Sequence, residues 1–120
     1  YESSRWGEGE RIMNFRTAYI YLDDIFAGEL SECEDGYVFI YDDRYFEDES
    51  KQAISLTIPK KQKRYISKIL FPFFDGLIPE GWMLNFVSTN WGINIRDRFG
   101  ILMVACKDTV SRVRVLEKKI

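Results

Sequence analysis

Carboxylate pairs are the groups in this 120-residue chain that could carry out acid–base chemistry. Two such pairs, Asp23–Asp24 and Asp42–Asp43, each lie next to segments of strand-like composition. Adjacent acids at these places are typical of solvated turns. An enzyme that uses carboxylates and lysines alone is therefore the weakest functional hypothesis. The chain contains no histidine, which excludes Ser-His-Asp and Cys-His nucleophilic sites and histidine-ligated metals. We expect no catalytic residue, no cofactor and no metal site.

Motifs for phosphate binding are also missing from the folded part of the sequence. Gly-x-Gly occurs only at residues 7–9, within a polar N-terminal segment. The sequence has no glycine-rich loop followed by a strand lysine, no catalytic-loop aspartate with its asparagine, and no Asp-Phe-Gly. These absences predict a protein that is not an enzyme and that acts by binding.

Charge is divided unevenly along the chain. Residues 1–49 hold 14 acidic and 4 basic side chains, whereas residues 50–120 hold 5 acidic and 13 basic ones. The basic side chains cluster at Lys60, Lys61, Lys63, Arg64 and Lys68. This cluster could form a nucleic-acid-binding patch, but such clusters are more often solvated loops. The sequence pI of about 5.2 also argues against a dedicated nucleic-acid binder. We therefore expect no direct contact with nucleic acid.

The length and composition indicate one globular domain with a hydrophobic core, since 46% of the residues are hydrophobic. Residues 1–12 are polar and predict a disordered extension, which leaves the domain at residues 13–120. No apolar run reaches the roughly 20 residues of a membrane span, and the N-terminus does not resemble a secretory signal. Cys33 and Cys106 are expected to be free thiols in a reducing compartment, the cytoplasm.

Segments rich in β-branched and aromatic residues predict an antiparallel sheet. The expected strands span residues 16–22, 25–30, 37–41, 53–58 and 113–116. Asp35–Gly36 marks a hairpin turn, because glycine accepts the positive φ that such turns require. Residues 42–50 are expected to form an acidic connection with Tyr45 and Phe46 tucked beneath it.

Two helices are expected in the C-terminal half. The first begins at Pro79 and Glu80, which suit a first helical turn, and ends at Gly92. Its buried stripe is predicted at Leu84, Val87 and Trp91. The second starts after Asn94 as N-cap, with its apolar stripe at Phe99, Leu102, Met103 and Cys106. The fold class is therefore α+β: a small antiparallel sheet or partial barrel of about five strands, packed with two main helices.

The segment from Leu70 to Trp82 concentrates aromatic, proline and glycine residues. Two prolines and a glycine interrupt it, so packed loop or short turns are expected there. We expect Phe71 and Phe73 to lie in the core. Trp82 follows a glycine in a first helical turn, where its indole can serve either the core or a protein interface.

The same residues carry a resemblance to a known family. The segment Leu70-Phe-Pro-Phe-Phe-Asp-Gly-Leu-Ile-Pro-Glu-Gly-Trp82, followed by Ile95-Arg-Asp-Arg-Phe-Gly-Ile-Leu102, resembles the signature of the HipA N-terminal domain. Residues 19–30 and 53–59 are similar to that family as well, and the resemblance extends over about residues 16–116. In HipA-type toxins this domain precedes a serine/threonine kinase core, and this sequence ends where the core would begin.

The resemblance implies a stand-alone copy similar to HipS, the small subunit of HipBST-type toxin–antitoxin systems. Such a subunit is an antitoxin that binds a separate HipA/HipT-like kinase and inhibits it. The alternative is a non-catalytic assembly domain that completes the active kinase or links it to a DNA-bound HipB-like helix-turn-helix repressor. No membrane partner is expected. The partner-binding residues expected are Phe74, Asp75, Ile78, Pro79, Glu80, Gly81 and Trp82.

Overall fold

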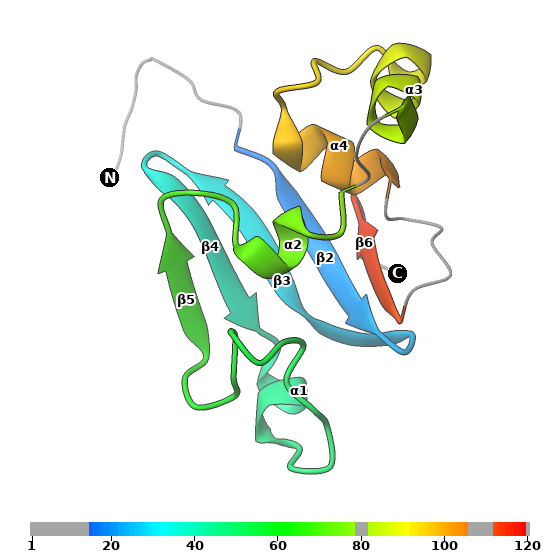
Figure 1. Cartoon of the computed structure of the whole chain (residues 1–120). Helices are drawn as coiled ribbons and strands as arrows, with labels where there is room; N and C mark the ends of the chain where they lie inside the picture. Colours follow the sequence, from blue (N-terminus) through cyan, green and yellow to red (C-terminus); the bar gives the residue numbers. More distant parts are fainter. Residues whose placement is uncertain (1–14, 79–81, 106–111, 120) are drawn as a thin grey trace.

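The computed structural model describes residues 15–78, 82–105 and 112–119. Its centre is a five-stranded antiparallel sheet with the strand order β5-β4-β3-β2-β6 (Figure 1). The strands are β2 (Thr17–Leu22), β3 (Ile25–Cys33), β4 (Gly36–Tyr41), β5 (Arg64–Ser67) and β6 (Val113–Leu116). The helices are α1 (Asp43–Glu47), α2 (Pro72–Asp75), α3 (Trp82–Trp91) and α4 (Arg98–Ala105). The α+β class is confirmed.

Three strands in chain order form a meander, as the sequence predicts. β2 pairs with β3 and β3 with β4, all antiparallel. Asp23 and Asp24 form the first turn with φ values of 52° and 65°, and positive φ at both central residues gives the twist that tight hairpins favour. The last strand returns to pair with β2, with Leu22 opposite Val113. The two ends of the described chain therefore lie in neighbouring strands.

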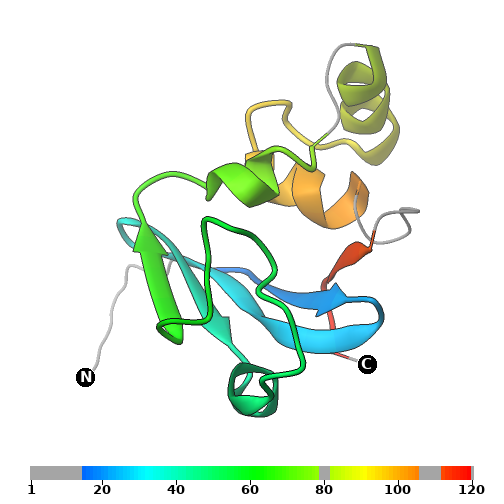
Figure 2. The ribbon, with the colours of Figure 1, turned by 60° about the horizontal axis from the view of Figure 1, so that its bottom comes forward.

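Helices α2 and α4 and the long connection after α1 cover one face of the sheet (Figure 2). The core lies between these layers. The largest side chains that are almost fully buried are Tyr41, Phe39, Phe74, Phe99, Ile20, Leu30, Ile58, Ile101, Leu102 and Val115. Because both layers contribute aromatic rings to this cluster, α2 and α4 are fixed to the sheet by burial of apolar area.

The prediction of a strand at residues 53–58 is wrong. This segment bends back in a tight turn with a single bridge between Ser55 and Ile58. Two of its backbone groups form hydrogen bonds with a side chain and not with a neighbouring strand. The Tyr41 hydroxyl accepts a hydrogen bond from the Ile54 amide at 3.1 Å and donates one to the Ile58 carbonyl. Leu56, at the tip, is 99% exposed. The fourth strand of the meander is β5, which lies inside the basic stretch.

The acidic connection contains α1, a short helix that the sequence analysis does not predict. Asp42 is its N-cap, and its carboxylate accepts a hydrogen bond from the Tyr45 amide at 3.3 Å. Tyr45 is buried and Phe46 half-buried, as expected. The connection therefore packs on the core through its aromatic residues.

The C-terminal helices differ from expectation in two places. Asp97, and not Asn94, caps α4, because its carboxylate accepts the Gly100 amide at 3.1 Å. Trp91 was expected on the buried stripe of α3 but is 56% exposed. The end of α3 at Gly92 is confirmed, since Gly92 has a φ of +63°. Phe99, Leu102 and Met103 are buried as predicted. Cys106 lies outside the described residues, as does the N-terminal extension 1–12.

Candidate protein-interaction surface

Phe74 is held in the core by other aromatic rings. Pro72 occupies the first turn of α2, where a missing N–H has no cost. The ring of Phe74 lies 5.8 Å from that of Phe39, 6.2 Å from Phe71 and 5.2 Å from Phe73, centre to centre. Its side chain is fully buried. Phe74 therefore supports the surface from beneath and offers no contact area of its own.

The other residues of the expected site are placed as follows. Ile78 is buried in the same core. Asp75 is half-buried, and its carboxylate accepts a hydrogen bond from Arg98 at 2.8 Å, which joins α2 to the start of α4. Pro79, Glu80 and Gly81 lie outside the described residues. So does the side chain of Trp82, whose backbone begins α3.

Helix α4 is fastened to the sheet by a charged cluster around Arg16. The guanidinium donates to Glu32 at 2.8 and 2.9 Å and to Asp97 at 2.8 and 2.9 Å. It also lies 5.2 Å from the centre of the Phe99 ring. These hydrogen bonds lower the pKa of Glu32 and of Asp97 and raise the pKa of Arg16. The start of α4 is therefore tied to both β2 and β3.

Helix α3 lies apart from the sheet and packs mainly on α4 (Figure 1). Its inner side uses partly buried residues that pack against the core, among them Leu84 and Val87, with Ile93 just beyond its end. The outward side chains include Phe86 and Trp91, each 56% exposed, and Ile95 follows at 39%. Exposed aromatic residues without charged neighbours in sequence are typical of interface centres.

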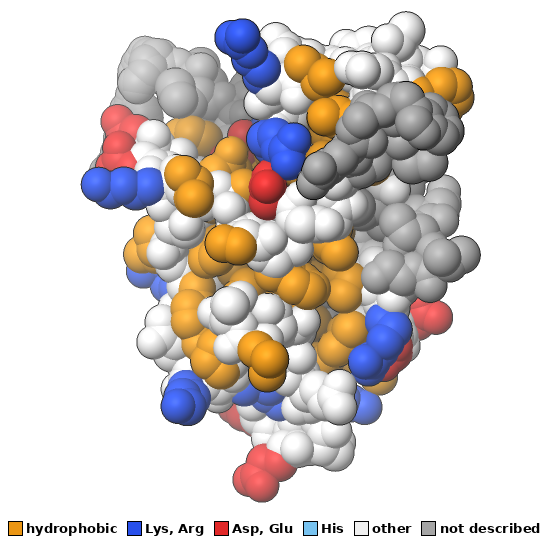
Figure 3. Space-filling model, in the orientation of Figure 1, with side chains coloured by type: hydrophobic (Ala, Val, Ile, Leu, Met, Phe, Trp, Pro, Cys, Tyr) orange, Lys and Arg blue, Asp and Glu red, His pale blue; other side chains and the backbone are white. Residues whose placement is uncertain are grey.

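The whole stretch of residues 81–95 contains no charged residue, in a chain that is 30% charged. This stretch includes all of α3 and most of the turn to α4. Figure 3 shows hydrophobic side chains over α3 and others in a band across the middle of the same face, over α2 and the neighbouring connection. We call α2, α3 and the α3–α4 turn the α2–α4 corner.

The sequence hypothesis placed the interface at Phe74, Asp75, Ile78 and residues 79–82, and it did not include the exposed side chains of Phe86, Trp91 and Ile95. The helical period assigned Trp91 to the buried stripe because it follows Leu84 by seven positions. The signal that could have found these residues is the absence of charge from 81 to 95, because a solvated helix face normally carries charges.

The shifted pKa values of the described groups arise from neighbouring side chains or from burial. Arg112 lowers the pKa of Asp23, and Ser50 lowers that of Asp48. Burial raises the pKa of Tyr41 to about 12. Among the described residues, no three His, Cys, Asp or Glu side chains meet in a way that could hold a metal ion. None of the described helices has the length and apolarity that crossing a bilayer requires.

Fold and surface together define a small α+β domain with a corner whose helix α3 carries no charge and exposes aromatic side chains. The family model of the HipA N-terminal domain matches residues 18–116. The chain belongs to the HipA N-terminal domain family, and the resemblance of its motifs is thereby confirmed. A solved structure, the N-terminal domain of HipA toxin, matches with a TM-score of 0.66 and 25% identity, over 92% of this chain and 98% of that one.

An uncharacterized protein of Haemophilus influenzae is a further relative. It is 30% identical over 104 residues, which cover 87% of this chain and 94% of that protein. The relative is therefore little longer than the domain itself.

Proposed function

We propose that this chain is an antitoxin-like subunit, similar to HipS, which binds a separate HipA/HipT-type serine/threonine kinase in the bacterial cytoplasm and inhibits it. Membership of the HipA N-terminal domain family supports a partner of the HipA type. The small Haemophilus influenzae relative supports a version of this domain that works without a kinase core in the same chain.

The observation that carries the proposal is the α2–α4 corner. It combines the Trp82 segment with the exposed rings of Phe86 and Trp91, in a stretch that lacks charge. An aromatic, uncharged surface can be desolvated at low cost when a partner covers it. The corner is also held in place, since Asp75–Arg98 fixes α2 to α4 and Arg16 fixes α4 to the sheet.

Inhibition through this corner has two physical forms. The corner can occupy the kinase's nucleotide cleft, or it can hold a kinase lobe away from its active arrangement. The second form requires that the chain binds the inactive arrangement more tightly than the active one, because only differential affinity shifts a population.

Binding of the purified kinase core to single-residue variants tests the site. Trp82→Ala is expected to weaken binding by about 2 kcal/mol or more, which is roughly thirtyfold. Phe86→Ser is expected to weaken it in the same direction. The matched control is Ile66→Ser on β5, an apolar residue that is 64% exposed and distant from the corner in sequence. Wild-type binding by Trp82→Ala and Phe86→Ser would reject the site.

The second candidate is an assembly domain that completes the kinase or links it to a HipB-like repressor on DNA. The basic edge strand favours it. Lys61, Arg64 and Lys68 make no ion pair with a described residue, whereas Lys63 pairs with Asp43 and Lys60 donates to two backbone carbonyls. Unpaired cations speed association with an acidic partner. A kinase that is more active with this chain than without it would select this candidate.

A further inference from the structure

Strand β5 forms an open edge of the sheet. It pairs with β4 on one side, and no described strand pairs with its other side (Figure 1). The Tyr41 amide donates to the Lys63 carbonyl at 2.9 Å. Because bonded and non-bonded pairs alternate in an antiparallel ladder, Arg64 and Ile66 belong to non-bonded pairs with β4. Their backbone N–H and C=O groups therefore point outward, along the open edge.

These outward backbone groups have few partners in the described chain. The Gln62 side-chain amide donates to the Arg64 carbonyl at 2.8 Å. No hydrogen bond from a described residue reaches the Arg64 amide or either backbone group of Ile66. The Arg64 carbonyl can accept a second hydrogen bond, because a carbonyl oxygen has two lone pairs. An unpaired edge of this kind is a template for one more extended chain.

The open edge also carries an apolar side chain on the uncovered face of the sheet. Ile66 lies opposite Val38, and Ile40 follows on the same face of β4. Ile66 is 64% exposed and Ile40 39% exposed, whereas Phe39, between them on β4, is buried on the covered face. An apolar side chain on a strand beside β5 would cover Ile66 and gain from the burial.

Charge along the open edge has one sign. Residues 50–74 contain six basic side chains and no acidic one. Two of them, Arg64 and Lys68, lie two positions before and two positions after Ile66, and both are exposed. Neither makes an ion pair with a described residue. A strand beside β5 would therefore have cations as cross-strand neighbours on both sides of Ile66.

The acids of the surrounding fold lie on the inner side of β5. Asp43 is already paired with Lys63. Glu34 and Asp35 belong to the turn between β3 and β4, where they line a hollow together with Lys68. Arg64 is therefore the cation of the open edge that an added strand could neutralise most directly.

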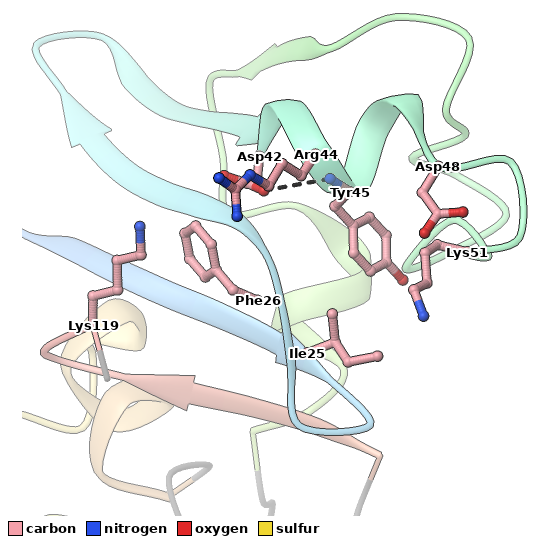
Figure 4. A pocket seen from close by; sticks show the side chains of 8 residues that line it. All are labelled: Ile25, Phe26, Asp42, Arg44, Tyr45, Asp48, Lys51 and Lys119. Carbon is pink, nitrogen blue, oxygen red and sulfur yellow. Dashed lines mark hydrogen bonds between the residues drawn. The ribbon is translucent and has the colours of Figure 1, made fainter.

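The hollow beside α1 lacks this bias of charge. It has a volume of about 530 Å³, and its lining includes the acids Asp42 and Asp48 as well as the bases Arg44, Lys51 and Lys119 (Figure 4). Acids and bases lie side by side there, so the hollow has no complementarity to a ligand of one sign. It supplies a control site for the edge.

A second copy of this chain does not fit the open edge. If two β5 strands paired with Ile66 opposite Ile66, Arg64 of each copy would lie opposite Lys68 of the other. Like charges directly opposite one another destabilise a strand pair, and cations on edge strands are a common protection against self-association. The same cations admit a strand that carries carboxylates, so they select the partner by charge.

We propose that the open edge of β5 binds an extended acidic segment of a partner protein by antiparallel strand addition. An apolar residue of the segment lies opposite Ile66 and exchanges two backbone hydrogen bonds with it. An acidic residue two positions later in the segment lies opposite Arg64. The edge faces away from α3 (Figure 1, Figure 2), so one chain can bind a kinase at the α2–α4 corner and this segment at the same time. The site does not depend on the proposed function.

Titration of the full ¹⁵N-labelled chain with short peptides tests the proposal. The probe is Thr-Glu-Thr-Val-Thr-Glu-Thr, which places both acids on the same face as the valine. Its matched control, Thr-Thr-Glu-Val-Glu-Thr-Thr, has the same composition but moves both acids to the other face. The probe is expected to bind about fivefold more tightly than the control. A third peptide with Lys in place of Glu is expected not to bind.

Hydrogen exchange distinguishes strand addition from attraction of charge alone. Exchange of the Ile66 amide should slow about tenfold or more in the complex, whereas the Tyr65 amide, which faces β4, should change little. N-methylation of the probe's valine should abolish binding, because that N–H faces Ile66. N-methylation of the threonine before it should be tolerated, because that N–H points away. Equal effects of the two methyl groups, or unchanged exchange at Ile66, would overturn the proposal.

Single variants of the chain provide the matching comparison. Arg64→Glu and Ile66→Ser are each expected to weaken probe binding about fivefold or more. Arg44→Glu, the same change at an exposed site in the hollow of Figure 4, should alter it less than twofold. Equal weakening by Arg64→Glu and Arg44→Glu would contradict the assignment.

A single strand of eight thymidine nucleotides tests the competing class of partner. It is expected to displace the probe poorly, because it offers no backbone donors and acceptors of an extended peptide; displacement as strong as that by the unlabelled probe would overturn the proposal in favour of nucleic acid. None of these measurements uses a kinase, so failure of the α2–α4 corner as a kinase site would leave their outcome unchanged.

Discussion

Arg16 and Asp97 are 81 positions apart in the sequence, yet two hydrogen bonds of 2.9 and 2.8 Å join their side chains. The same guanidinium holds Glu32 on β3. Asp97 in turn caps the first turn of α4 through the Gly100 amide. One arginine before β2 therefore sets the position of the helix on which α3 and the α2–α4 corner rest.

Removal of this arginine should destabilise the domain. Arg16→Met is expected to lower the free energy of unfolding by about 1–2 kcal/mol, a value reduced by the partial exposure of the three side chains. Urea denaturation of both proteins measures it. Arg112→Met is the matched control, because the Arg112–Asp23 pair is exposed at the hairpin turn, and its loss should lower the free energy of unfolding clearly less than Arg16→Met does. Equal losses would show that the Arg16 cluster has no special role.

The same cluster predicts a pH dependence. Arg16 holds the pKa values of Glu32 and Asp97 below their ordinary values. The folded state therefore binds fewer protons than the unfolded chain near pH 4, and stability rises with pH in that region. This contribution is complete above the unfolded pKa, about 4, and disappears as the pH falls through the lower folded values. Melting temperatures from pH 2.5 to 6 should show a shallower slope for Arg16→Met; an unchanged slope contradicts the assignment.

Gly28 is required by the packing of β3 against β4. A Cβ atom there would lie 2.4 Å from the Ile40 carbonyl oxygen and 2.8 Å from a ring carbon of Phe39. Gly28→Ala is expected to cost about 2–3 kcal/mol of unfolding free energy. At Gly92 a Cβ meets nothing within 4 Å, and only the positive φ opposes it. Gly92→Ala should therefore cost only about 1 kcal/mol by the same denaturation measurement.

The Tyr41 hydroxyl supplies the hydrogen bonds that a neighbouring strand would otherwise make with the 53–58 turn. Tyr41→Phe would leave the Ile54 amide and the Ile58 carbonyl without this partner in a buried place. We expect a loss of about 2–4 kcal/mol and faster amide exchange at Ile54. Tyr19→Phe is the control, since the Tyr19 hydroxyl makes no hydrogen bond with a described residue. A loss below about 0.5 kcal/mol for Tyr41→Phe would disprove this role.

The sequence predicted the elements whose local signals agree with their packing. Strands β2, β3, β4 and β6 have the alternation and turn residues of a meander, and Gly92 ends α3 as glycine commonly does. Residues 53–58 were predicted as a strand because they are apolar, but Ile54 and Ile58 are buried by a turn. Strand β5 was not predicted because it lies among lysines and arginines, which are not typical of strands. The conformation of residues 53–58 depends on hydrogen bonds to the distant Tyr41 hydroxyl, and a local sequence pattern cannot show such a contact.

The exposed aromatic residues of the candidate surface were predicted only in part, for a similar reason. Aromatic residues at helical spacing fit a core and an exposed surface equally well, and Trp91 was assigned to the buried stripe although it is 56% exposed. Which side of α3 faces inward depends on its contact with α4, and this contact depends on the tie between Arg16 and Asp97. Composition alone did carry information, since the charge-free stretch 81–95 coincides with the exposed helix.

The activity of a HipA/HipT-type kinase core from the same organism, titrated with this chain, tests the central claim most directly. The account predicts that autophosphorylation falls toward zero as the chain approaches one equivalent. With Phe86→Ser or Trp82→Ala, the titration midpoint should move to higher concentration by tenfold or more, while Ile66→Ser should match the wild type. A kinase that binds the chain and keeps or increases its activity at saturation would contradict the account.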